Sequence, residues 1–88
     1  RRIEASILVL LADRAATASI CPSEAVRRVF GDAFGSHMEH ARQAARRLAH
    51  KEQVVILQRG AAVDPARFRG PIRIARGSRF PSSVPEDQ

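Results

Sequence analysis

The chain has 88 residues, of which 44% are hydrophobic and 27% charged, so it fits one globular domain and excludes a largely disordered chain. No apolar run approaches the roughly 18 residues of a membrane span, and the single cysteine, Cys21, excludes an internal disulfide and fits a cytoplasmic location. The formal net charge of +6 favours a polyanionic partner, although the dominance of arginine over lysine also follows from a GC-rich genome.

The first half of the sequence predicts two helices joined by an extended segment. Apolar residues from Ile3 to Leu11 recur at helical spacing, which predicts an amphipathic helix over residues 2–14. Residues 17–20 can form a short strand. The motif Cys21-Pro22-Ser23-Glu24 predicts the start of the second helix, because proline loses no hydrogen bond there and the acidic residue complements the helix dipole. Gly31 is expected to end this helix.

A third helix is predicted over residues 37–51. It follows a short loop in which Phe34 is expected to fill the core. Ser36 and Glu39 have the spacing of a capping box, S-x-x-E, which is typical of a helix start. Residues at three- and four-residue steps predict the face that packs on the core. These are Met38, Ala41, Ala45 and Leu48.

The second half of the sequence predicts two strands and a tail. Residues 53–57 and 72–75 are rich in β-branched and apolar side chains, and the long loop between them contains glycine and proline. Residues 77–88 are rich in serine and proline and are expected to be a disordered tail. The order of three helices and then two strands predicts an α+β domain over residues 1–76. We expect a winged helix, in which a three-helix helix-turn-helix core precedes a β-hairpin wing.

Three short motifs occur in order along the chain. They are Ile20-Cys21-Pro22-Ser23-Glu24, then Gln58-Arg59-Gly60 with Val63-Asp64-Pro65, and then Arg69-Gly70-Pro71-Ile72-Arg73. In these motifs the chain resembles a family of uncharacterised bacterial proteins, a domain of unknown function, over about residues 3–75. The resemblance implies a winged-helix fold and brings no established activity.

Two positions depart from the pattern of that family. Lys51-Glu52-Gln53 stands where a glycine often precedes the first wing strand. Ala61-Ala62 stands where the tip of the wing often carries a lysine. The second departure removes a charge from the position that most easily reaches a phosphate.

The exposed face of the third helix and the wing form the candidate nucleic-acid site. In helix-turn-helix proteins the second helix of the motif enters the major groove, where arginine can read guanine and glutamine can read adenine. Arginines of the wing would neutralise phosphates. The competing interpretations are an ordinary solvated helix face and, for Arg73 and Arg76, protection of an edge strand. The candidate residues are Gln43, Arg46, Arg47 and His50 on the helix, and Arg59, Arg67, Arg69 and Arg73 on the wing.

Other sites are weaker predictions. The helix start at residues 21–24 can hold a phosphate, but ordinary capping explains the same residues. His37 and His40, with Glu39 and Cys21, have a spacing that suits a metal ion, but this pattern is common in proteins without metal. The sequence contains no phosphate-binding glycine loop and no nucleophile motif. We therefore expect no enzyme activity, no metal and no cofactor.

Three functions are compatible with these features. The first is a small bacterial winged-helix protein that binds double-stranded DNA through the third helix, with phosphate contacts from the wing. The alternative is a winged-helix module that binds an acidic protein partner and has no role with nucleic acid. RNA binding shares the charge but lacks the aromatic residues that stack on bases, since the chain has no Trp or Tyr. No membrane partner is expected, and the oligomeric state stays open.

Overall fold

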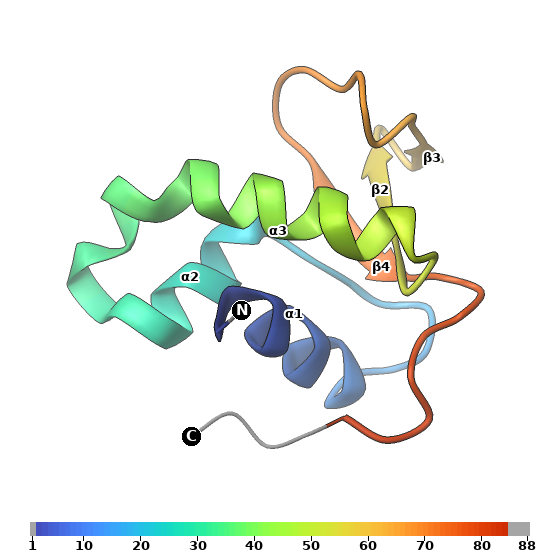
Figure 1. Cartoon of the computed structure of the whole chain (residues 1–88), viewed down its shortest axis with the longest axis horizontal. Coiled ribbons are helices and arrows are strands. Elements are labelled where there is room, and N and C mark those ends of the chain that lie inside the picture. The colour runs from blue at the N-terminus through green and yellow to red at the C-terminus, as the bar shows by residue number, and fades with distance from the viewer. Residues whose placement is uncertain (1, 85–88) are drawn as a thin grey trace.

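Residues 2–84 are described by the computed structural model, and they form three α-helices and a four-stranded antiparallel sheet around one core (Figure 1). A 3-10 helix, η1, joins the second and third α-helices. This confirms the predicted α+β class. No helix within the described residues is long and apolar enough to cross a membrane. In chain order the elements are α1 (Arg2–Ala12), β1 (Ser19–Ile20), α2 (Pro22–Phe30), η1 (Gly31–His37), α3 (Met38–His50), β2 (Val54–Gln58), β3 (Ala61–Ala62) and β4 (Arg73–Arg76).

The sheet has the order β1-β4-β2-β3, so the last strand of the sequence lies inside it. Ile74 of β4 is opposite Ile20 of β1 and Ile56 of β2. These three isoleucines form one row across three strands, and each is at most 1% exposed. Because β-branched residues pack well on a pleated surface, this row gives the helices a continuous apolar layer to cover.

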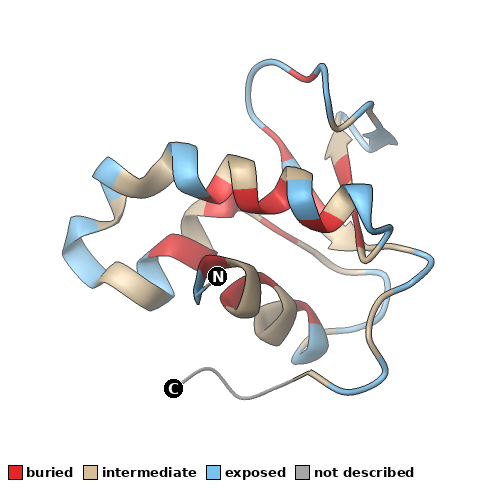
Figure 2. Cartoon of the chain, viewed as in Figure 1, coloured by how far each residue is buried: buried red, intermediate tan, exposed pale blue. Residues whose placement is uncertain are grey.

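The helices cover this row with a mixture of large and small side chains. Ile7 and Leu11 of α1 are buried, and so are Ala41, Ala45 and Leu48 of α3. Figure 2 shows the buried residues where the helices face one another and the sheet. The predicted core face of the third helix is confirmed at these three positions. Two details differ, since Met38 is only half-buried and Ala44 is also fully buried.

The capping box lies at the start of α2, where the sequence predicted a helix start. The amide of Cys21 donates to a Glu24 oxygen at 2.9 Å. The capping box predicted at Ser36 and Glu39 is wrong. The Ser36 hydroxyl donates to the Ala33 carbonyl, and Glu39 accepts a hydrogen bond from Gln43 instead. The physical reason is that η1 runs directly into α3, so no extended residue precedes the helix.

The turn between β2 and β3 is a two-residue hairpin that the sequence did not predict as paired strands. Gln58 lies opposite Ala61, and the two residues between them, Arg59 and Gly60, have φ angles of 52° and 79°. Left-handed conformations at both positions match the twist of a tight hairpin. After this hairpin the chain returns to β4. We call residues 59–72, which include the hairpin turn and β3, the β2–β4 connection.

The first part of the predicted disordered tail contacts the domain. The amide of Gly77 donates to the Gln53 carbonyl at 3.0 Å, and the amide of Arg79 donates to the Glu52 carbonyl at 2.8 Å. Phe80 packs against the core, beneath the guanidinium of Arg76. The structure therefore places this segment beside the turn that follows α3. The last predicted tail residues, 85–88, lie outside the described residues.

Candidate nucleic-acid interface

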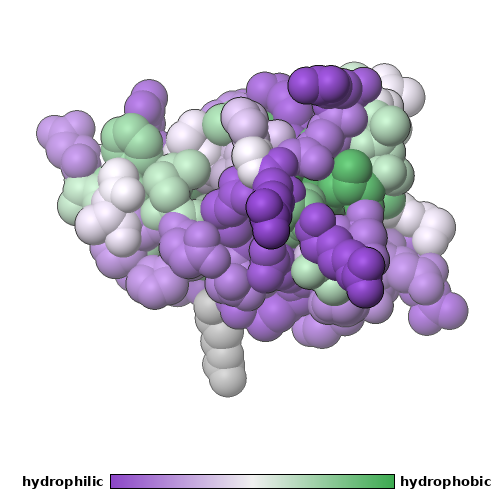
Figure 3. Space-filling model, turned by 90° about the horizontal axis from the view of Figure 1, so that it is seen from above, coloured by the Kyte–Doolittle hydropathy of each residue, from purple (hydrophilic) through white to green (hydrophobic). Residues whose placement is uncertain are grey.

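The outer face of α3 and the β2–β4 connection lie on the same side of the molecule. Figure 3 looks onto this side, which is mostly hydrophilic, and its most hydrophilic side chains gather around a small apolar patch. Seven of the eight predicted site residues belong to α3 or the β2–β4 connection, while Arg73 lies on β4. The contacts of these side chains show which of them are open to a ligand.

Two of the predicted residues on α3 are held by carboxylates. Arg47 forms an ion pair with Glu4 of α1. Gln43 donates to Glu39, one helical turn earlier, at 2.8 Å. His50 is exposed at the end of α3. Of these three residues, only His50 is unengaged by a carboxylate among the described residues.

Arg46 packs on an aromatic ring of the β2–β4 connection. Its guanidinium lies 4.5 Å from the centroid of the Phe68 ring, and Phe68 is 5% exposed. Arg42 lies over the same ring at 4.8 Å. The Nε atom of Arg46 is buried and has no hydrogen-bond partner among the described residues. Phe68 therefore fixes both arginines and attaches the connection to α3.

Arg42 is not among the site residues that the sequence predicts. The sequence did contain a signal for it, because Arg42 precedes Arg46 by four residues and therefore shares its side of the helix. The aromatic partner was also present in sequence, since Phe68 lies between two predicted site residues, Arg67 and Arg69. The sequence did not show that Phe68 of the β2–β4 connection contacts these arginines of α3.

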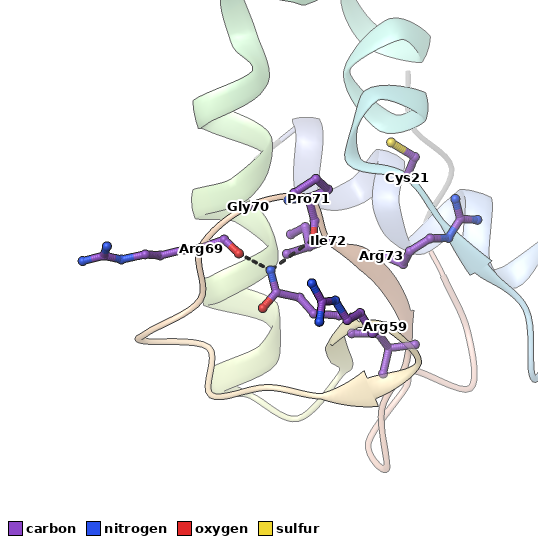
Figure 4. Close-up of a pocket in the computed structure, with 9 residues that line it drawn as sticks. Cys21, Arg59, Arg69, Gly70, Pro71, Ile72 and Arg73 are labelled. Atoms are coloured by element: carbon purple, nitrogen blue, oxygen red, sulfur yellow. Dashed lines mark hydrogen bonds between the residues drawn. The ribbon is translucent and has the colours of Figure 1, made fainter.

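Three arginines of the β2–β4 connection are exposed and form no ion pair among the described residues. They are Arg59, Arg67 and Arg69. The backbone that carries them is held by hydrogen bonds. Gln58 Nε2 donates to the carbonyls of Arg69 and Pro71, the latter at 3.1 Å (Figure 4). These cations therefore extend from an ordered loop, and they are the part of the predicted site most open to a phosphate.

Arg73 has a different environment from the other predicted wing residues. Its guanidinium donates to the hydroxyl and the carbonyl of Ser19, at 2.8 and 2.9 Å, across the β1–β4 pair. Arg76 donates to the Leu11 and Arg14 carbonyls, each at 2.9 Å, and so caps α1. The edge-strand interpretation of Arg73 and Arg76 is wrong, because β4 lies between β1 and β2.

The start of α2 is occupied by side chains of the protein itself. Glu24 accepts from the Cys21 amide and forms an ion pair with Arg14 at 2.7 Å. The hydrogen bond from Arg14, with that from the Cys21 amide, holds the pKa of Glu24 below its usual range. The carboxylate takes the place that a phosphate would need. These contacts favour the capping interpretation of this motif.

The two histidines of the weaker metal prediction contact each other. The Nδ1 atoms of His37 and His40 are 3.3 Å apart, and the His37 ring stacks on Phe30 with centroids 3.6 Å apart. Glu39, the third residue of that prediction, accepts from Gln43. Among residues 2–84, no three His, Cys, Asp or Glu side chains are grouped closely enough to hold a metal ion.

Comparison with known proteins identifies a family. A family model described as "Protein of unknown function (DUF3253)" matches residues 1–77. The match includes all three motifs on which the resemblance rests. No curated protein matches the sequence.

Proposed function

The chain belongs to the DUF3253 family of proteins of unknown function, and from its own geometry we propose that it is a winged-helix module that binds double-stranded DNA. In this proposal α3 faces the major groove, the β2–β4 connection serves as the wing, and wing arginines contact phosphates. The observation that carries the proposal is a group of three exposed arginines beside α3 that form no ion pair within residues 2–84, namely Arg59, Arg67 and Arg69.

The topology supports the winged-helix part of the proposal. A strand between the first two helices pairs with the last strand, which also pairs with the strand that follows the third helix. The three helices thereby lie against a small sheet from which the β2–β4 connection extends. This order of elements is the one expected when a helix-turn-helix core carries a hairpin wing. The link between the second and third helices is a 3-10 helix of seven residues, longer than the simplest turn.

The charges support phosphate contacts more strongly than contacts to bases. The three wing arginines are exposed, whereas Arg47 and Gln43 on α3 are engaged by carboxylates. Each phosphate neutralised by a cation releases condensed counterions, which favours binding to any duplex sequence. We therefore expect weak, salt-dependent binding with little sequence preference. A single module of this kind binds duplex DNA with a Kd of about 10⁻⁴–10⁻⁶ M at physiological salt.

An NMR titration of the whole chain with a short mixed-sequence duplex, at two salt concentrations, tests the proposal. We expect salt-sensitive amide shifts confined to residues 38–51 and 59–71. No shifts at the lower salt concentration would overturn it. Shifts spread evenly over all surfaces, including α2, would also contradict it, because they would reflect net charge and not a defined interface.

The second candidate is a winged-helix module that binds an acidic protein. The engagement of Arg47 by Glu4 and of Gln43 by Glu39 favours it, because these residues would then not be needed to read bases. The same titration separates the two candidates. Absence of duplex binding, together with capture of a partner through the wing arginines, would support the second.

A further inference from the structure

A cleft lies between the β2–β3 turn, the segment that leads into β4, and the residue that precedes α2. Its volume is about 840 Å³, which is within the range of about 300–1,000 Å³ that is usual for small-molecule sites. Most of its lining is apolar. Its lining includes Leu57, Gln58, Arg59, Pro71, Ile72 and Arg73 (Figure 4).

One of the lining arginines, Arg59, brings an exposed positive charge to the cleft. Arg59 lies among the lining residues in Figure 4, whereas the Arg69 side chain extends away from them and contributes its backbone. The guanidinium of Arg73 is directed toward β1, where it donates to Ser19, and away from Arg59 (Figure 4). Neither Arg59 nor Arg73 forms an ion pair among the described residues. The cleft therefore combines one exposed cation, Arg59, with an apolar lining, and Arg73 adds a second positive charge that faces Ser19.

A nearby carboxylate does not cancel this charge. Glu24 is close enough to Arg73 to be stabilised by it, but Glu24 is paired with Arg14 at 2.7 Å. Gln58 holds the backbone on one side of the cleft, because its Nε2 atom donates to the Arg69 and Pro71 carbonyls. The positive charge of Arg59 suits an anion, and the apolar residues suit a body attached to it.

We infer that this cleft binds a small organic anion. Its carboxylate or phosphate would lie on Arg59, and its apolar body would lie on Leu57, Pro71 and Ile72. The site stands apart from the proposed function, because it needs no DNA. If the DNA proposal and the cleft proposal both hold, the two sites share Arg59, so a bound anion competes with duplex DNA for this arginine. The domain then carries its own effector site.

Phenyl phosphate is the probe for this site, and NMR of the whole chain is the measurement. We expect saturable shifts of the Leu57 and Ile72 methyl groups and of amides 69–73, with a Kd of about 1 mM for so small a ligand. Inorganic phosphate lacks the apolar body and benzyl alcohol lacks the charge, so each is expected to bind about tenfold more weakly. Benzoate shows whether a carboxylate replaces the phosphate.

A matched pair of variants tests the role of Arg59. Arg59→Asn removes the charge and creates Asn-Gly, the pair favoured in a tight hairpin, so the fold is retained. Arg67→Asn removes an exposed charge from the same connection, at a position that does not line the cleft. We expect phenyl phosphate to bind R59N about tenfold more weakly and R67N as well as wild type. Equal weakening of both variants, or equal binding of phenyl phosphate and inorganic phosphate, would overturn the inference.

Competition with DNA is measured separately, so the two proposals can fail independently. Phenyl phosphate at saturation is expected to raise the duplex Kd of wild type and to leave that of R59N unchanged. A chain that binds phenyl phosphate but no duplex would support the cleft and refute the DNA proposal. A chain that binds duplex but gives no saturable shifts with phenyl phosphate would refute the cleft alone.

Discussion

The guanidinium of Arg46 lies 4.5 Å from the centroid of the Phe68 ring, so a residue that the sequence assigned to base reading instead joins α3 to the β2–β4 connection. Arg42 lies over the same ring at 4.8 Å. Because Phe68 is buried between its neighbours Arg67 and Arg69, fixing its ring also fixes the backbone from which these two arginines extend. The surface proposed to bind phosphate is therefore built around one aromatic residue.

Phe68→Ala is expected to destabilise the domain and weaken duplex binding. Removing a buried phenyl ring leaves a cavity, which costs about 3 kcal/mol of the free energy of unfolding. Phe68→Leu fills most of the space but loses the cation–π contacts, and we expect it to cost about 1 kcal/mol. Urea unfolding measures both values. Equal stability of Phe68→Leu and wild type would show that the arginines contribute nothing through the ring, and equal stability of the two variants would show that the side chain fills no packed space.

Glu4→Gln is expected to release Arg47 for contact with DNA. The pair is partly exposed, with the Arg47 side chain 53% exposed, so its loss costs less than about 1 kcal/mol of the free energy of unfolding. Duplex affinity measured by fluorescence anisotropy should rise by a few-fold at low salt. The double variant Glu4→Gln with Arg47→Ala serves as the control and should lose this gain. An unchanged affinity in the single variant would show that Arg47 is not near the DNA.

Arg67→Gln is expected to change the salt dependence of duplex binding. With about four to five phosphates contacted, the slope of log K against log salt concentration should be about −4, and removing one contact should reduce its magnitude by about 0.9. Arg27→Gln is the matched control, because Arg27 is an exposed arginine on α2, away from the proposed interface. Equal slope changes in the two variants would contradict a localised interface.

Stability is expected to fall at acidic pH through Glu24. Its pKa is lower in the folded chain than in the unfolded one, so its ionised form stabilises the fold. This contribution is complete above the ordinary glutamate pKa of about 4.3, and it is lost as the pH falls through the folded value. Because the Glu24 side chain is 35% exposed, its contribution is under about 1 kcal/mol. Thermal unfolding from pH 7 downward should show a smaller loss of stability in Glu24→Gln, and parallel curves would refute the assignment.

Gly77→Ala is expected to destabilise the domain, although the sequence placed Gly77 in the tail. A Cβ atom at this position would lie 2.4 Å from the Glu52 carbonyl oxygen and 2.9 Å from the Val54 nitrogen, so the backbone would have to move. We expect a loss of about 1–3 kcal/mol in urea unfolding. Gly35→Ala is the control, because nothing lies within 4 Å of its added Cβ. If G77A is as stable as G35A, residue 77 is not part of the packed domain.

The sequence by itself determined the order of the three α-helices and of the two longer strands, the α+β class, the core face of α3 and the family. Each of these features can be read from residue types and their spacing along the chain. The spacing of Ala41, Ala45 and Leu48 identifies the buried side of a helix without knowledge of what covers it. The capping box at Ser36 and Glu39 was wrong because a 3-10 helix runs directly into α3, a feature that depends on how the preceding residues pack.

Only the tertiary structure decided which arginines are available to a ligand. Arg47 and Glu4 are 43 residues apart in sequence, Arg73 and Ser19 are 54 apart, and Arg76 and Leu11 are 65 apart. Helical periodicity shows that a side chain points away from the core, but it does not show which neighbouring element lies there. An arginine is engaged when a carboxylate or a carbonyl from another element packs beside it. The exposed arginines of the β2–β4 connection can therefore be told from the engaged arginines only once the positions of the elements in space are known.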